Sequence, residues 1–221
     1  MKHNLNHQLE IFPVWSNIFY MIYSIAAFIV LFLLKNRGII FRPVVWVFIV
    51  GMIVEGVIST VYHTHTTAYR ENETITKTDL VLSILDEFFA NCVCLLLIFI
   101  VFNRGDTNYR NSKSPINGFF IILILISAFA GLVCFILDTY YENKDTNLEK
   151  PENYEIYDIF HSEWHTLTAV AFILTVLYIF TNPILFSYTG YIQYPRIEKY
   201  IYVLFIVILI GVVAINLTKK G

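Results

Sequence analysis

Charged residues are scarce in this 221-residue chain. Asp, Glu, Lys and Arg together make up 14% of it, against about 25% in an average soluble domain. Hydrophobic residues make up 57%, and the mean hydropathy is +0.63. So little charge cannot coat a globular surface, and the composition therefore argues against a soluble enzyme, a nucleic-acid-binding protein and a disordered protein.

Cysteine is scarce as well, and other common sequence features are missing. Cys92, Cys94 and Cys134 all fall within apolar runs, and no second pair accompanies Cys92-Val-Cys94. This pattern favours packed thiols over a disulfide framework or a metal knuckle. The chain has no internal repeat, low-complexity linker or glycine-rich phosphate loop. We therefore expect residues 1–221 to form a single membrane domain.

Long apolar runs and aromatic residues are abundant. Aromatic residues make up 17% of the chain, and their rings suit membrane interfaces. A bilayer-spanning helix needs about 20 mostly apolar residues. Six segments meet this requirement, at about residues 14–34, 39–63, 80–102, 117–137, 157–180 and 197–217. The sequence therefore predicts an all-α polytopic bundle with six spans, and a seventh is conceivable only in the Pro- and Gly-interrupted segment 182–195.

The basic residues are unevenly distributed over the connections between these spans. The first, third and fifth connections hold Lys35, Arg37, Arg42, Arg104, Arg110, Lys113, Arg196 and Lys199, whereas the second and fourth are acidic. By the positive-inside rule the odd-numbered connections are cytoplasmic, which places both termini on the other side. Lys219 and Lys220 argue for the opposite orientation.

Several ionisable side chains fall within the predicted spans, where each costs a few kcal/mol and so marks a functional or paired group. They are Glu55 and His63 in the second span, Asp86 and Glu87 in the third, and Asp158, His161, Glu163 and His165 in the fifth. If the helices alternate in direction, the end of the second span and the starts of the third and fifth lie at the same membrane face. The orientation above makes this the non-cytoplasmic face.

The spacing of the histidines predicts that three of them meet. Ser59 and His63 are four residues apart, as are His161 and His165, so each pair lies on one helix face. His63, His161 and His165 can then surround one point, with Asp86 at the same depth. Three imidazoles and an open fourth position form a catalytic zinc arrangement. We therefore predict a Zn²⁺ site at His63, His161 and His165.

Structural roles remain open for the individual side chains. A lone histidine near a helix end is usually an interfacial or hydrogen-bonded residue, and we expect His65 to lie in a loop. Glu55 extends the Ser59–His63 stripe one turn deeper, either as a partner of the site or as a packed carboxylate. Glu87 and Glu163 fall on other helix faces and are expected at the interface.

At these residues the sequence resembles the CREST superfamily, which groups alkaline ceramidases with progestin and adiponectin receptor-like proteins and Per-type GPI-remodelling proteins. The matching motifs are Ser59-Thr-Val-Tyr-His63, Leu85-Asp86-Glu87 and His161-Ser-Glu-Trp-His165 followed by Thr-Leu-Thr. The segment 10–17, with Trp15-Ser16-Asn17, is similar to the start of the first span in alkaline ceramidases. The similarity is limited to these motifs and to their order and spacing, and it does not extend to every segment.

The resemblance implies an intramembrane zinc hydrolase. It implies that His63, His161 and His165 bind zinc, that Asp86 orients or deprotonates the metal-bound water, and that Ser59 steadies the developing oxyanion. The chain departs from the family in two respects. The histidine pair lies in the fifth of six spans rather than in the last of seven, and Glu10 is the only carboxylate before the first span, so no calcium site is predicted.

The expected function is hydrolysis of an amide or ester bond in a membrane lipid. A ceramide-like lipid is the first substrate to consider, and an ester of a GPI-lipid or a glycerolipid is the alternative. A non-enzymatic lipid receptor or assembly factor with a structural metal site is the competing interpretation. A metal or proton transporter fits less well, because transport favours polar residues at several depths and here only Glu55 lies deeper.

Overall fold

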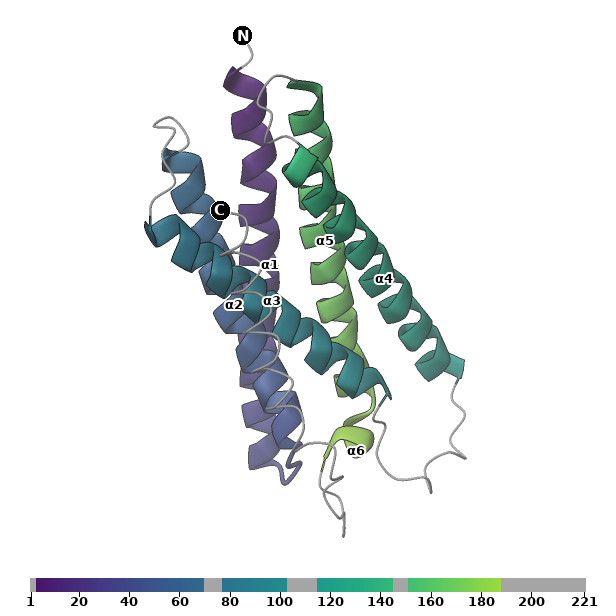
Figure 1. Cartoon of the computed structure of the whole chain (residues 1–221). Coiled ribbons are helices and arrows are strands. Elements are labelled where there is room, and N and C mark those ends of the chain that lie inside the picture. The colour runs from purple at the N-terminus through teal and green to yellow at the C-terminus, as the bar shows by residue number, and fades with distance from the viewer. Residues whose placement is uncertain (1–2, 70–76, 103–114, 145–150, 188–221) are drawn as a thin grey trace.

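The computed structural model describes residues 3–69, 77–102, 115–144 and 151–187, and these residues form a bundle of helices without named strands (Figure 1). The helices are α1 (His3–Asn36), α2 (Pro43–Tyr69), α3 (Lys77–Phe102), α4 (Pro115–Lys144), α5 (Pro151–Thr181) and the short α6 (Pro183–Phe186). Helix α1 packs against α2 and α5, α2 against α3, and α4 along α5.

Five of these helices are long and apolar enough to cross a membrane. Their spanning portions are Val14–Asn36, Pro43–His65, Leu80–Phe102, Gly118–Tyr141 and Ile159–Thr181. They match the first five predicted spans and support a multi-pass integral membrane protein. The sixth predicted span, at 197–217, lies outside the described residues, and the described part of 182–195 contains only the four-residue helix α6.

The turn after α1 shows how the chain reverses between two spans. Gly38 has a φ of +87°, a left-handed conformation that glycine adopts without steric cost. The amide of Ile39 donates to the carbonyl of Leu34, and the amide of Gly38 donates to that of Lys35. This Schellman pattern satisfies carbonyl groups at the helix end. The chain then enters α2 antiparallel to α1.

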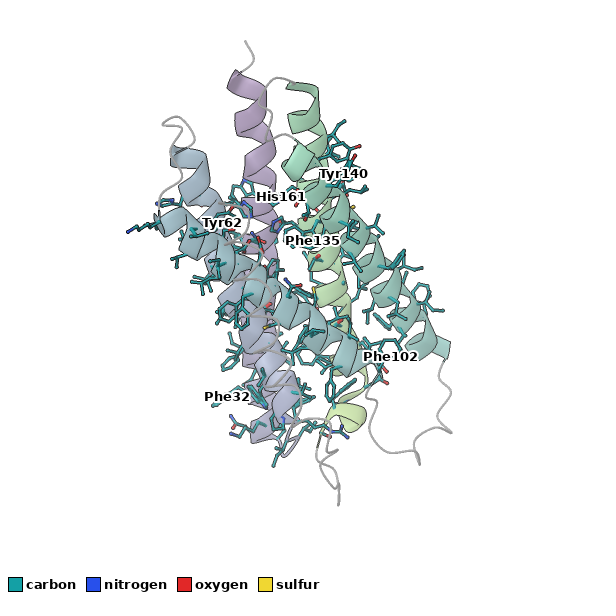
Figure 2. All side chains as sticks on the ribbon, in the orientation of Figure 1. Phe32, Tyr62, Phe102, Phe135, Tyr140 and His161 are labelled. Carbon is teal, nitrogen blue, oxygen red and sulfur yellow. The ribbon has the colours of Figure 1, made fainter. Side chains whose placement is uncertain are left out.

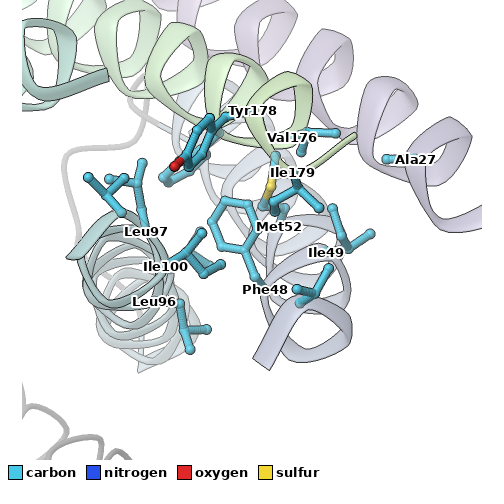
Figure 3. Close-up of a cluster of buried hydrophobic side chains, with 14 of the residues drawn as sticks. Ala27, Phe48, Ile49, Met52, Leu96, Leu97, Ile100, Val176, Tyr178 and Ile179 are labelled. Carbon is cyan, nitrogen blue, oxygen red and sulfur yellow. The ribbon is translucent and has the colours of Figure 1, made fainter. Parts of the chain in front are cut away.

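The apolar core lies at the end of the bundle where α2 begins and where α3 and α5 finish. Phe48 and Met52 of α2, Leu97 and Ile100 of α3, and Tyr178 of α5 are almost completely buried there (Figure 3). In contrast, large apolar side chains also cover the outside of the described helices. Phe19, Phe102, Phe119 and Phe129 are each more than 60% exposed, as expected for surfaces that face lipid.

Two glycines allow neighbouring helices to approach closely. A Cβ added at Gly56 of α2 would lie 2.9 Å from Cβ of Met21 on α1, and one at Gly131 of α4 would lie 3.2 Å from Oγ1 of Thr168 on α5. Small residues commonly occupy such positions in membrane helix interfaces. The approach at Gly56 brings α1 against the polar end of α2.

Candidate metal centre

Three histidines meet at one end of the bundle. His63 comes from the last turns of α2, whereas His161 and His165 come from the first half of α5. One nitrogen from each ring can be chosen so that all three lie within 4.8 Å of one another. The ring centroids of His161 and His165 lie 4.8 Å apart. The ring centroid of His63 lies 5.0 Å from that of His161 and 4.8 Å from that of His165.

Antiparallel packing explains why these residues meet. The end of α2 and the starts of α1, α3 and α5 lie at the same end of the bundle (Figure 1). In Figure 2 His161 and Tyr62 lie toward this end, whereas Phe32 lies at the opposite one. His161 and His165 share a face of α5 because four residues make slightly more than one helical turn. The structure thus brings together the three histidines selected from the sequence.

The donor set fits a zinc ion. Two nitrogens bound to tetrahedral zinc, each about 2.0–2.1 Å from the ion, lie about 3.3 Å apart. Nε2 of His63 and Nε2 of His165 lie 3.1 Å apart. Both side chains are buried, with 7% and 5% of their surface exposed. His161 completes the imidazole set from the adjacent turn of α5.

Asp86 and Ser59 lie beside the histidines in a hydrogen-bonded chain. Nδ2 of Asn17 on α1 donates to Oγ of Ser59 on α2 at 2.7 Å, and the Ser59 side chain is hydrogen-bonded to the Asp86 carboxylate on α3. All three residues are buried. Oδ1 of Asp86 has no hydrogen-bond partner among the described residues. The carboxylate also interacts electrostatically with His161, so Asp86 belongs to the same polar cluster.

Two residues of this cluster, Asn17 and Asp138, lie outside the set of site residues predicted from the sequence. Asn17 belongs to the Trp15-Ser16-Asn17 segment. Oδ1 of Asp138, near the end of α4, lies 3.3 Å from Nδ1 of His161. A signal for Asp138 existed, because it is a carboxylate at the edge of an otherwise apolar run. The predicted span ends at residue 137, which places Asp138 in the following connection.

The structure also places the other ionisable residues predicted within the spans, and they differ in burial and surroundings. Glu55 is buried one turn below Ser59 and interacts electrostatically with Asp86. Glu163 is exposed, whereas Glu87 is partly buried. The prediction that His65 lies in a loop is wrong, because α2 continues to Tyr69 and includes it. Asp158 lies in α5, but its side chain is outside the described set.

An apolar pocket adjoins the histidines between α3, α4 and α5, with a volume of about 130 Å³. Trp164 lines it and also contacts the rings of His161 and His165, at centroid distances of 5.6 and 4.6 Å. Leu132 and Ile98 line it as well and are 52% and 45% exposed. The pocket therefore reaches exposed apolar side chains, and Trp164 is the lining residue that also contacts the histidines.

No protein-family model, curated protein or solved structure matches this chain. The site is therefore defined by its own residues and their geometry.

Proposed function

We propose that the protein is a zinc-dependent intramembrane hydrolase that cleaves an amide or ester bond in an acyl lipid. The main supporting observation is the group formed by the buried His63 and His165 and the partly buried His161, with one nitrogen from each ring within 4.8 Å of the others, next to a buried carboxylate. The resemblance of these same residues to the CREST superfamily motifs supports the same activity. Among the substrates of this class, a ceramide-like lipid is the first to test.

The three histidines would hold the zinc ion. When bound at such a site, zinc lowers the pKa of a coordinated water to about 7 and polarises a carbonyl group. The histidines come from two helices packed around one core, which fixes their separation before metal binds. The burial of His63 and His165 would limit the access of bulk water to the reacting bond and so strengthen electrostatic interactions there.

Asp86 is assigned the role of general base. Its Oδ1 has no hydrogen-bond partner among the described residues, so it is available to accept a proton from the attacking water. In hydrolysis the water oxygen bonds to the carbonyl carbon, the C–N or C–O bond breaks, and the proton passes to the leaving amine or alcohol. Asp86 would accept the proton from the attacking water and then pass it to the leaving group.

Ser59 is assigned a different role from the one implied by the family resemblance. Its hydroxyl accepts a hydrogen bond from Asn17, and its single proton is available to the Asp86 carboxylate. A proton directed to Asp86 is not free to bind an oxyanion at the same time. We therefore assign Ser59 and Asn17 to the orientation of Asp86.

The pocket beside Trp164 provides the site for an acyl chain. Its lining is almost wholly apolar and extends along α3 from Ala90 to Ile98 and along α4 from Phe135 to Ala128. At about 1.5 Å per residue, each of these stretches is about 10–12 Å long. Because exposed Leu132 and Ile98 lie at its rim, a lipid can enter from the bilayer and place its carbonyl near the histidines.

The test is to measure zinc content and lipid hydrolysis on the same purified protein. The zinc-loaded protein is incubated with total membrane lipid, and the products are profiled by mass spectrometry. We expect one zinc per chain and release of fatty acid from one lipid class. His161→Ala, which leaves only His63 and His165 in the metal-binding group, should bind zinc much more weakly and lose hydrolysis. His65→Ala is the matched control, since His65 lies on α2 beside His63 but outside the metal-binding group.

Two results would contradict the proposal. A protein without stoichiometric zinc would remove the metal-dependent mechanism. A protein that binds zinc and is destabilised by His161→Ala, yet releases no fatty acid from any lipid, would instead indicate a structural metal in a receptor or assembly factor.

A further inference from the structure

Asp138 is a carboxylate buried in a membrane-spanning segment. It lies near the end of the span Gly118–Tyr141 and is 6% exposed. A charged group in this position is costly unless it is paired. Its partner is on the neighbouring helix, where Nδ1 of His161 lies 3.3 Å from Oδ1 of Asp138, at ion-pair distance but without the alignment of a hydrogen bond. Helix α4, which supplies none of the three histidines, thus contacts one of them directly.

The ring of His161 lies close to a carboxylate of α4 and to three other aromatic rings. Its Nδ1 faces Asp138 of α4, and its ring also approaches those of His63 and His165. Trp164 packs beside it at a centroid distance of 5.6 Å. Because Asp138 lies beside Nδ1, a metal would be bound through Nε2.

A histidine that binds a metal usually donates its other ring N–H to a carboxylate, carbonyl or water, which fixes the tautomer and the ring orientation. We infer that Asp138 is the positioning residue for His161, holding the proton on Nδ1 and directing Nε2 to the zinc ion. This inference rests on the proposed function, because it assumes that the three histidines bind zinc. It assigns α4 a role in metal binding although α4 provides no ligand.

The competing explanation is that the pair only joins α4 to α5. In that case Asp138 would contribute to folding, and its effect on metal binding would follow from any loss of stability. The two roles differ in how they depend on His161. A positioning effect disappears when His161 is absent, whereas a contribution to helix packing that does not involve the metal persists.

The experiment measures zinc affinity by competition with a chromophoric chelator in the full-length protein in detergent. Asp138→Asn, which keeps the shape of the side chain, should weaken zinc binding about 10–100-fold, the usual effect of losing such a partner. Asp138→Glu restores the carboxylate and should recover part of the affinity. The matched control is Glu163→Gln, which removes one charge from an exposed position on α5 and should leave the affinity unchanged.

A double-mutant cycle separates positioning from folding. In a His161→Ala background, Asp138→Asn should cause no further loss of zinc affinity, and thermal unfolding of metal-free protein shows whether each variant is folded. An equal loss with and without His161, or unchanged affinity in Asp138→Asn, overturns the inference while leaving the proposed function intact. If the unsubstituted protein binds no zinc, both fail.

Discussion

At the scale of single residues, the polar cluster is organised around Asp86. This carboxylate comes from α3, and its neighbours Ser59 and Asn17 come from α2 and α1. Each hydrogen bond in the chain involves a group that would be costly to bury alone. The cluster therefore links three helices, while one oxygen of Asp86 has no hydrogen-bond partner among the described residues.

Replacing Asp86 with Asn tests its role as general base. The amide is close in size to the carboxylate but cannot accept a proton, so we expect hydrolysis to fall by about 10²–10⁴-fold while zinc content is retained. The measurement is initial-rate lipid hydrolysis together with metal analysis. Glu87→Gln is the control for loss of a neighbouring charge, and it should keep most of the activity. Full turnover in Asp86→Asn would remove the proposed role of Asp86.

At the scale of helices, close packing of α1 on α2 positions the Asn17–Ser59 hydrogen bond. Gly56 lies one turn before Ser59 and three residues from it along α2. Its missing side chain leaves room for Met21 of α1, and a Cβ there would also lie 3.3 Å from the ring of Tyr20. The contact at Met21 involves its Cβ, which cannot move away without shifting the backbone. The α1–α2 interface therefore depends on this glycine.

Gly56→Ala should destabilise the protein, because overpacking of a tight interface typically costs about 1–3 kcal/mol. Gly118→Ala provides the matched control. Apart from its own turn of α4, no atom of the described residues lies within 4 Å of the corresponding Cβ position, and alanine has the higher helix propensity by up to about 1 kcal/mol. Thermal unfolding in detergent should show a lower midpoint for Gly56→Ala and an unchanged or higher one for Gly118→Ala. The reverse order would contradict the proposed close packing.

At the scale of the whole molecule, the polar cluster and the apolar core occupy opposite ends of the described bundle. The histidines lie at the end of α2, and the core around Phe48 and Met52 lies near its start. Exposed apolar side chains surround the helices between these ends. This arrangement places the candidate site near one membrane face, with its pocket open toward the lipid.

The distribution of basic residues predicts that the histidine end of the bundle lies at the non-cytoplasmic face of the membrane. Lys77 begins α3 at the histidine end, and Arg37 follows α1 at the other end; both are exposed. In a variant with its native cysteines replaced, a membrane-impermeant thiol reagent applied to the non-cytoplasmic side should label Lys77→Cys and not Arg37→Cys. Permeabilised membranes, in which both positions should react, provide the control. Labelling of Arg37→Cys alone in sealed membranes would reverse the orientation.

The sequence by itself determined the five membrane-spanning segments that lie within the described residues, and most of the cluster. Apolar runs of about 20 residues identify helical spans, because a helix that crosses a bilayer satisfies its backbone polar groups internally. Helical spacing then placed His161 and His165 on one face, and alternating direction placed His63 and Asp86 at the same end. These inferences depend only on local periodicity and parity, which a single sequence contains.

Only the tertiary structure decided which faces of the remaining helices turn toward that cluster. Asn17 and Asp138 reach it because α1 packs on α2 and α4 packs along α5, and the rotation of a mostly apolar helix about its axis leaves little trace in its sequence. The pocket beside Trp164 likewise requires three helices at fixed separations. Local spacing selects which residues can share a face, whereas packing between distant segments determines what that face meets.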